Sequence, residues 1–348
     1  LGVRLGLPAR AVKQRVLPKG APPLSGGGTI KLVSPGWVVW ADAPERFEVG
    51  TPSILSAILL ARALEITRQS GKDIFKREKW VKPSGFEDIF APYDPDEGDS
   101  DLLETLLSAL PGGNIRIPTA QGQNSYVYLD HAASKPALLP VLNAFLAALR
   151  LPEELYGNVV RHTAAACTAY FNAPPDDYEV IFTANTSEAI NLLAAVLPES
   201  LPHTRPAYII NSILDHHSNE LPWRYAPGWR FIRLEADALG WIDLNQLEQE
   251  LKKITLDGQD KDHPPVLVSI CGASNVLGTL NDLEAISELV HRYGALLLVD
   301  AAQLAAHRAV DMKALDIDFL AFSGHKVYAP FGSGALLARR GLLNGERL

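Results

Sequence analysis

The sequence predicts an α/β protein with a mostly parallel β-sheet between helices. Beyond Tyr126, short apolar runs alternate with longer amphipathic stretches, which is the pattern of a parallel sheet covered by helices. The composition agrees, because 47% of the 348 residues are hydrophobic and 21% are charged, as in globular proteins with a sizeable core. The candidate strands are residues 180–183, 208–210, 231–234, 266–270, 295–299 and 319–322.

Two stretches between these runs have the spacing of amphipathic helices. After Asn281, which we expect to cap a helix together with Glu284, apolar side chains recur at helical spacing until Gly294. Residues 243–253 repeat the pattern, with leucines on one side. In an open α/β sheet, ligands bind beyond the carboxyl ends of the strands, so the residues that follow each strand are the candidate site.

Charge, cysteine content and hydropathy exclude several classes of protein. The formal net charge of −8 argues against nucleic acid as a partner, because phosphate backbones attract clustered Lys and Arg. The two cysteines, Cys167 and Cys271, form no CxxC motif or zinc spacing, and they fit a reducing, cytoplasmic location. No apolar run reaches the roughly 18 residues of a membrane span, so we expect no membrane partner.

Two segments before Tyr126 have an unusual charge. Several basic residues precede the first acidic one, Asp42, which is compatible with a transit peptide or with an interior segment of a longer unit. Residues 84–115 contain no Lys or Arg and many acidic residues, which predicts an exposed linker followed by a short helix over 101–110. We therefore divide the chain into residues 1–80, an acidic linker over 81–124 and a large domain over 125–348.

Small polar residues follow several of the candidate strands. Thr186 and Ser187 begin an apolar helix, where hydroxyls and free backbone amides suit a phosphate group, and a plain helix cap is the alternative. His216 and His217 are adjacent, a spacing that does not converge on one metal ion, so we expect no metal site. Ser323 follows the last of these runs.

Asp300 and Lys326 together indicate a specific chemistry. Asp300 ends a fully apolar strand, where an unpaired carboxylate is costly, so we expect it to have a cationic partner. Lys326 lies just beyond the next strand, where its amine can bind an anion, snorkel to solvent or form a Schiff base. An acid that holds a protonated ring nitrogen and an amine that forms a Schiff base are the two requirements of pyridoxal phosphate catalysis.

Six short motifs occur in the order found in one family of such enzymes. They are residues 128–134 (YLDHAAS), 186–191 (TSEAIN), 216–223 (HHSNELPW), 274–278 (SNVLG), 300–303 (DAAQ) and 323–326 (SGHK). On these residues the chain resembles the class V aminotransferases, and above all their cysteine desulfurase and selenocysteine lyase branch. The resemblance implies a fold-type I architecture, a pyridoxal 5'-phosphate cofactor and a small amino-acid substrate.

The resemblance also implies a role for each matching residue. Lys326 corresponds to the Schiff-base lysine, Asp300 to the partner of the pyridine nitrogen and His216 to the imidazole that stacks on the ring. These three are the expected catalytic residues. The other expected cofactor contacts are Gln303 at the phenolate oxygen, Asn275 at the substrate or the cofactor edge, and Thr186, Ser187, Ser323 and His325 at the phosphate.

One piece of the family pattern is out of order. Residues 26–30 (GGGTI) and 44–52 (PERFEVGTP) follow the Schiff-base lysine in relatives but precede Lys326 here. This order fits a circular permutation, a window on a tandem array or an artefact of gene assembly. In the desulfurase-like dimers, the threonine that matches Thr51 reaches the cofactor phosphate of the neighbouring subunit. We therefore expect a homodimer with active sites at the interface, and a plain helix start at Thr51 is the alternative.

The small C-terminal domain of relatives, with its sulfur-accepting cysteine and its substrate-binding arginine, has no recognisable counterpart in this sequence. Cys271 ends a predicted strand and Cys167 lies among alanines, which favours structural roles for both thiols over a persulfide relay. We expect cleavage of a Cβ–S or Cβ–Se bond in a small amino acid. Transamination is one alternative, and a catalytically impaired fold that serves as a binding or assembly module is the other.

Overall fold

The computed structural model describes residues 20–34, 36–43, 45–50, 61, 65, 85, 87–90, 115–200, 207–256 and 265–343. The chain forms two compact units. The smaller unit comprises residues 1–9, 53–163 and 324–332, and the larger unit comprises residues 10–52, 164–323 and 333–348.

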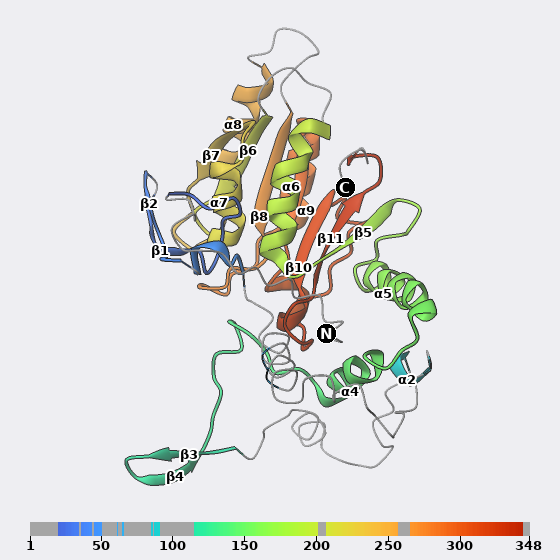
Figure 1. Cartoon of the computed structure of the whole chain (residues 1–348). Coiled ribbons are helices and arrows are strands. Elements are labelled where there is room, and N and C mark those ends of the chain that lie inside the picture. The colour runs from blue at the N-terminus through green and yellow to red at the C-terminus, as the bar shows by residue number, and fades with distance from the viewer. Residues whose placement is uncertain are drawn as a thin grey trace. The chain divides into compact units, whose positions relative to one another are not determined.

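A seven-stranded sheet forms the centre of the larger unit (Figure 1). Its strands are β5 (Tyr178–Thr183), β6 (Ala207–Ser212), β7 (Trp229–Leu234), β8 (Val266–Cys271), β9 (Leu296–Asp300), β10 (Phe319–Ser323) and β11 (Gly334–Arg339). They lie in the order β5-β11-β10-β9-β8-β6-β7. Strand β11 runs antiparallel to β5 and β10, whereas the other pairs are parallel. The predicted mostly parallel sheet is therefore confirmed.

Each predicted strand is present, with ends that differ from the prediction by no more than two residues. Strand β11 was not predicted. Its residues before Arg339 are small or apolar and all buried, so they show no alternation between an inner and an outer face. A short run of this kind does not distinguish a strand from a buried helical turn.

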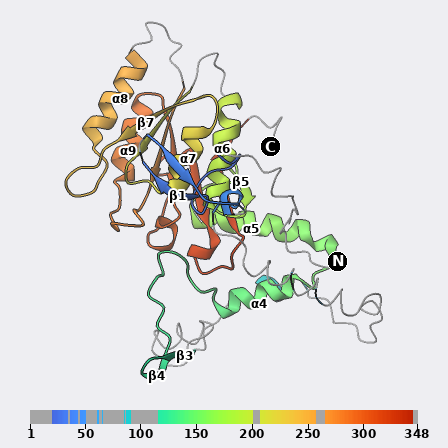
Figure 2. The same cartoon turned by 60° about the vertical axis from the view of Figure 1, so that its left-hand side comes forward.

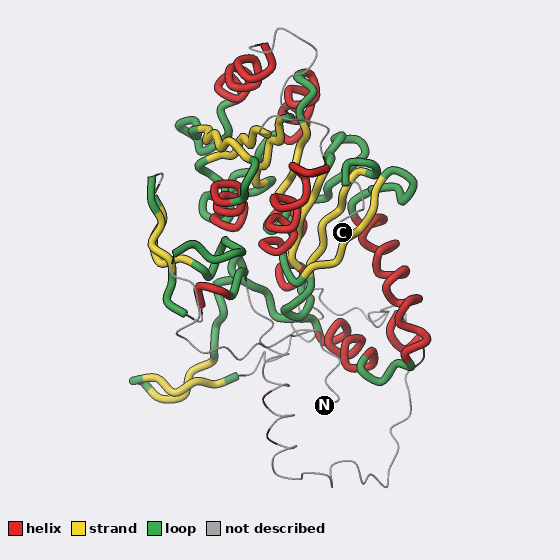
Figure 3. The backbone as a smooth tube through the Cα atoms, turned by 45° about the horizontal axis from the view of Figure 1, so that its top comes forward, coloured by secondary structure: helices red, strands yellow, loops and turns green. Residues whose placement is uncertain are grey.

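Helices pack on the sheet as the amphipathic pattern predicts. They are α6 (Thr186–Ser200), α7 (His217–Tyr225), α8 (Leu244–Leu256) and α9 (Leu283–Arg292). The buried side chains of α6, among them Ile190, Leu193 and Leu197, pack against Phe319 and Leu336 of the sheet. Figure 2 shows α6 and α9 on opposite sides of the sheet, and the tube of Figure 3 shows its strands with helices around them. This burial contributes most of the stabilisation that aligns the strand ends.

Helix α9 does not begin as expected. Asp282, and not Asn281, is the N-cap, since its side chain accepts a hydrogen bond from the backbone N–H of Ala285. The Asn281 amide instead donates to the carbonyl of Cys271 over 2.8 Å and accepts from the backbone N–H of Ile242. The amide therefore holds together two loops that the sequence separates, which a local pattern does not predict.

The segment that carries the out-of-order motif also belongs to the larger unit. It forms the hairpin β1 (Ile30–Val33) and β2 (Val38–Trp40), followed by the 3-10 helix η2 (Glu45–Phe47). The hairpin packs beside α7, where the Trp40 and Tyr225 rings lie 5.1 Å apart. Asn191 of α6 exchanges hydrogen bonds with the backbone of Ser25. The segment thus contacts the same two helices that carry candidate site residues.

The described part of the smaller unit contains α2 (Glu87–Phe90), the hairpin β3 (Arg116–Thr119) and β4 (Gly122–Ser125), α4 (Leu139–Ala148), the 3-10 helix η4 (Glu153–Leu155), the first half of α5 (Tyr156–Tyr170) and the 3-10 helix η6 (Gly324–Lys326). The backbone N–H of Lys135 donates to the carbonyl of His325, and that of Leu138 donates to the carbonyl of Tyr328. These bonds attach η6 to the segment before α4. The helix predicted over 101–110 lies outside the described residues, and the domain boundaries remain predictions.

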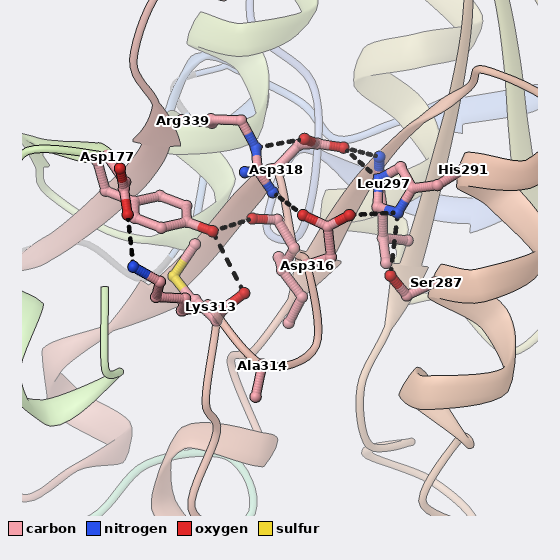
Figure 4. A network of polar contacts seen from close by, with 12 residues as sticks. Asp177, Ser287, His291, Leu297, Lys313, Ala314, Asp316, Asp318 and Arg339 are labelled. Carbon is pink, nitrogen blue, oxygen red and sulfur yellow. Dashed lines mark hydrogen bonds and ion pairs between the residues drawn. The ribbon is translucent and has the colours of Figure 1, made fainter. Parts of the chain in front are cut away.

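A network of ion pairs lies at the amino ends of the parallel strands (Figure 4). Its centre is the buried carboxylate of Asp318, which accepts from Arg339 Nε over 2.8 Å, from the backbone N–H of Leu297 over 2.9 Å and contacts His291 Nε2 at 2.9 Å. Asp316 pairs with the same His291 and Arg339 side chains. Ion pairs and hydrogen bonds thus stabilise this end of the strands, whereas the candidate site residues follow the carboxyl ends.

Candidate functional site

The start of α6 contributes the first group of residues to the candidate site. Asn185 caps the helix by accepting from the backbone N–H of Glu188 over 2.9 Å. The Ser323 hydroxyl oxygen accepts from the backbone N–H of Thr186 over 2.8 Å and lies 2.7 Å from the Thr186 hydroxyl. Thr186, Ser187 and Ser323 are all buried. The structure therefore brings together three of the predicted phosphate contacts at a helix N-terminus, which favours anions.

Hydrogen bonds of Ser218 connect the start of α6 to His216. The Ser187 hydroxyl donates to Ser218 Oγ over 2.6 Å, and the backbone N–H of Gly27 donates to the same oxygen over 3.1 Å. The backbone N–H of Ser218 donates to His216 Nδ1 over 3.2 Å, so His216 is the N-cap of α7. Sequence reasoning did not assign a role to Ser218. Its place inside the 216–223 motif was the available signal.

Asp300 and Gln303 lie at the end of β9, in the same edge of the sheet. Asp300 is only 4% exposed, and its Oδ1 accepts from the backbone N–H of Ala302 over 2.9 Å. Gln303 is also buried, at the start of the 3-10 helix η5 (Leu304–Ala306). Asp300 pairs in register with Cys271 of β8 and Ala321 of β10. The carboxylate is thus buried at the end of an apolar strand, as the sequence predicted.

A second buried carboxyl group, Asp215, holds the loop that carries His216. Its Oδ1 accepts from Asn219 Nδ2 over 2.9 Å and from the backbone N–H of Cys271, and its Oδ2 accepts from the backbone N–H of Ser212 over 2.7 Å. Burial raises the pKa of Asp215 to about 7, although these hydrogen bonds oppose the rise and the nearby Asp300 adds to it. Sequence reasoning missed this residue, since its bond to Cys271 joins it to a strand 56 residues away, which no local pattern reveals.

Asn275 lies apart from these contacts, in an exposed turn after β8. The Ser274 hydroxyl accepts from the backbone N–H groups of Val276 and Leu277, which fixes the turn. Among the described residues, no hydrogen bond or ion pair joins the Asn275 side chain to the buried residues at the strand ends. Its predicted role at the substrate or cofactor edge remains a prediction.

His325 and Lys326 belong to the smaller unit, where they form η6 directly after Ser323. Burial lowers the pKa of His325 to about 4, with a contribution from the charge of Lys326. Burial and the same Lys326 charge also lower the pKa of Lys135, whose ammonium lies 5.3 Å from the centre of the Tyr328 ring. Lys135 was not predicted as a site residue. Two lysines therefore lie close together around the predicted Schiff-base position.

Thr51 lies outside the described residues. Gly50, the residue before it, donates its backbone N–H to the Gly27 carbonyl over 2.8 Å. A Cβ added to Gly50 would be 2.6 Å from the Asn185 amide oxygen, so Gly50 touches the helix cap of its own chain. The predicted contact of Thr51 with a neighbouring subunit stays a prediction.

Both cysteines are free in the described structure, where Cys271 is buried and Cys167 is partly buried. Burial raises the pKa of the Cys271 thiol well above its usual range, and the carboxyl groups of Asp215 and Asp300 raise it further. Burial also raises the pKa of the Cys167 thiol. Because the thiolate is the nucleophilic form, neither cysteine has the environment of a reactive one.

The residues at this edge fit pyridoxal phosphate in their chemistry. Buried hydroxyls at a helix start suit the phosphate, a buried carboxylate suits a protonated ring nitrogen, and an exposed imidazole suits the face of a ring. Asn211 Oδ1 and Arg233 Nε are the buried side-chain atoms without a hydrogen-bond partner within the described residues, and neither belongs to this set. Groups of His, Cys, Asp or Glu able to hold a metal ion are absent from the described ranges. None of the helices described is long and apolar enough to cross a membrane.

The sheet and the residues at its carboxyl edge define an α/β protein with the architecture of the fold-type I large domain. The family model of class-V aminotransferases matches residues 6–82 and 127–346. The chain therefore belongs to the class-V aminotransferase family. The match includes both the segment with the out-of-order motif and the segment that ends beyond Lys326.

The chain is also similar to proteins named as cysteine desulfurases. It is 35% identical to a probable cysteine desulfurase of Methanothermobacter thermautotrophicus over 61% of this chain and 52% of that protein. It is 35% identical to one of Streptomyces coelicolor over 62% of this chain and 53% of that protein. The structure of a cysteine desulfurase from Thermococcus onnurineus NA1 matches with a TM-score of 0.56 and 28% identity, over 68% of this chain and 57% of that one. The chain thus spans about half the length of the curated relatives it matches.

Proposed function

We propose that this chain contributes the cofactor-binding part of a pyridoxal phosphate-dependent enzyme that cleaves the Cβ–S or Cβ–Se bond of a small amino acid. The observation that carries the proposal is the buried Asp300 carboxylate at the same sheet edge as the hydroxyl groups of Thr186, Ser187 and Ser323. A buried carboxylate and buried hydroxyl groups at a helix N-terminus are the groups that the ring nitrogen and the phosphate of pyridoxal phosphate require. The names of the similar proteins support the reaction type.

Each residue has a distinct task in this proposal. Thr186, Ser187 and Ser323 bind the phosphate group, and Asp300 keeps a proton on the ring nitrogen through its negative charge. His216 covers one face of the ring. Lys326 supplies the amine that attaches the cofactor and afterwards accepts and returns a proton as general base and acid. When bound, the cofactor supplies the electron sink that stabilises negative charge on the substrate carbon.

Cofactor attachment is tested first on the purified full chain. Incubation with pyridoxal phosphate and borohydride reduction should add the cofactor mass, and unreduced protein should absorb in the near-visible range. Lys326→Ala should abolish both signals. Lys313→Ala is the matched control, because Lys313 is an exposed lysine that pairs with Asp177 at the opposite sheet edge. Wild-type protein that gains neither mass nor absorption would refute the proposal.

The route taken by sulfur is tested with cysteine as the substrate. Sulfide release that persists after Cys167→Ser and Cys271→Ser favours direct elimination without either thiol, as their raised pKa values suggest. Loss of sulfide with one of these variants, while the cofactor still binds, would assign a relay to that cysteine. 3-Mercaptopyruvate, a keto acid that keeps its sulfur, as the main product would favour transamination instead, whereas elimination leaves pyruvate, ammonia and sulfide.

We also infer a homodimer in a reducing, cytoplasmic setting. Leu239, Trp241, Val276 and Leu277 form an exposed apolar patch, in which the Gly240 turn lies against Leu277 and Thr279 bonds to the Gly240 carbonyl. Exposed apolar patches of this kind mark interaction sites. Leu277→Asp should shift the protein towards the monomer in sedimentation velocity. An unchanged dimer would place the interface elsewhere, and a monomeric wild type would contradict the inference.

A further inference from the structure

The ring of His216 is exposed to solvent and yet held in place. Its Nδ1 atom accepts a hydrogen bond from the backbone N–H of Ser218 over 3.2 Å. An imidazole that accepts at Nδ1 carries its proton on Nε2, which fixes the tautomer of the neutral ring. An exposed side chain rotates at little cost, so a second, packing contact restricts the ring plane further.

Gly27 makes that second contact. A Cβ atom added to Gly27 would lie 2.9 Å from His216 Cε1, closer than real Cβ atoms approach, and 3.2 Å from Ser218 Oγ, which is a tight contact. At the neighbouring positions the backbone itself favours glycine, since Gly26 and Gly28 have positive φ values of +156° and +88°. Gly27 has no such backbone requirement. The space above it is filled by the imidazole.

The turn that carries Gly27 is anchored on both sides, so it does not move away easily. The Gly27 N–H donates to Ser218 Oγ over 3.1 Å, and the Gly27 carbonyl accepts from the Gly50 N–H over 2.8 Å. The Thr29 hydroxyl donates to the Gly26 carbonyl over 2.8 Å. A side chain at position 27 would therefore displace the imidazole more readily than the turn.

We propose that Gly27 is a positioning residue that sets the orientation of the His216 ring, and hence the surface on which an aromatic cofactor ring stacks. The part that this surface plays in cofactor binding rests on the proposed function, whereas the contact between Gly27 and His216 is independent of it. The proposal gives the out-of-order segment a direct part in the site. It also accounts for a glycine at a position where the backbone alone would accept alanine.

The test compares Gly27→Ala with Gly36→Ala in the full chain. Gly36 is the matched control, because an added Cβ meets nothing within 4 Å there and its φ is ordinary. In protein without cofactor, the NMR signal of His216 Cε1, assigned by its loss in His216→Ala, should shift in Gly27→Ala and stay in place in Gly36→Ala. Pyridoxal phosphate should bind roughly tenfold more weakly to Gly27→Ala, the change that about 1.4 kcal/mol of overpacking strain produces.

A double-variant comparison separates positioning from general damage to the fold. In a His216→Ala background, Gly27→Ala should weaken cofactor binding by less than threefold, because the clash is gone and coupled residues are not additive. Ser218→Ala removes the anchor of the turn without adding bulk, and should also shift the His216 signal. The proposal is overturned if Gly27→Ala leaves that signal unmoved, or if its binding defect is the same with and without His216. If wild-type protein binds no pyridoxal phosphate, the proposed function fails, and the NMR comparison still decides the contact.

Discussion

The hydroxyl oxygens of Thr186 and Ser323 lie 2.7 Å apart although 137 residues separate them in the chain. Strand β11 lies between β5, which precedes the helix that begins at Thr186, and β10, which ends at Ser323. Its first residue, Gly334, pairs with both Thr183 and Ser323. A Cβ on Gly334 would lie 2.7 Å from the Phe322 carbonyl oxygen and 2.9 Å from Asn185 Cα. A glycine at this position therefore permits the close approach of the helix start to the end of β10.

Ser323→Ala should weaken the binding of pyridoxal phosphate and of inorganic phosphate. The change removes the acceptor of the Thr186 N–H together with a hydroxyl that faces the proposed phosphate, and leaves a buried donor unpaired. We expect roughly tenfold weaker binding, equivalent to about 1.4 kcal/mol, measured by fluorescence titration. Ser200→Ala is the control, since its hydroxyl bonds only the Val196 carbonyl at the far end of α6. Equal affinities of the two variants would remove Ser323 from the phosphate site.

Asp215→Asn should destabilise the protein more than Asp177→Asn. The amide has one acceptor oxygen where the carboxylate has two, so at least one of the donors from Ser212, Asn219 and Cys271 loses its partner. An unpaired buried donor costs about 1–3 kcal/mol, to be measured by urea unfolding. Asp177 forms an exposed pair with Lys313 and should change the free energy of unfolding by about 0.5 kcal/mol or less. Similar losses for both would contradict the role of Asp215.

Asp215 should also make stability fall as the pH rises. Its pKa in the folded protein is about 7, above the 3.8 of the free side chain, so the folded state binds the proton more tightly. The resulting stabilisation is complete below about pH 4 and is lost as the pH rises to about 7. The free energies of unfolding of wild type and of Asp215→Asn, measured with urea across this range, should become more alike as the pH rises. Curves that stay parallel would show that Asp215 does not titrate in this way.

His325 should have the opposite effect. Burial and the Lys326 charge lower its pKa from 6.5 to about 4, so the folded protein favours the neutral ring. The stabilisation is present above pH 6.5 and is lost as the pH falls to about 4. His325→Gln should flatten the acid limb of the stability curve, whereas His131→Gln, at an exposed histidine, should leave it unchanged. If the stability of wild type falls no more steeply at acid pH than that of His325→Gln, the lowered pKa of His325 is disproved.

His291 should stabilise the opposite edge of the sheet in its charged form. The hydrogen bond to Asp318 raises its pKa, Asp316 adds to the rise, and burial and Arg339 oppose it. The stabilisation is therefore present below about pH 6.5 and is lost as the pH rises through the higher folded value. His291→Gln should remove about 1–2 kcal/mol at pH 6 and less at pH 9, by urea unfolding. An equal loss at both pH values would mean that the ring contributes only as a neutral hydrogen-bonding group.

Much of the fold was predictable because its determinants are local. Buried parallel strands such as β8 and β9 are uninterrupted apolar runs, and polar residues such as Asp300 and Ser323 stand directly after them. The predicted N-cap at Asn281 was wrong because its side chain bonds to Cys271, at the end of β8, and to Ile242, which lies 39 residues earlier in the chain. Ser218 and Asp215 were missed for the same reason, since their partners come from several segments.

The sequence by itself determined the order of the strands along the chain, the residues at their carboxyl ends and the family. Tertiary structure decided that β11 separates β5 from β10, that Asp215 ties His216 to β8, and that Gly27 lies against the imidazole. Periodicity and capping act over a few residues and can be read from the chain. Strand pairing and the packing of a distant turn depend on which buried surfaces fit together, and that fit exists only in the folded molecule.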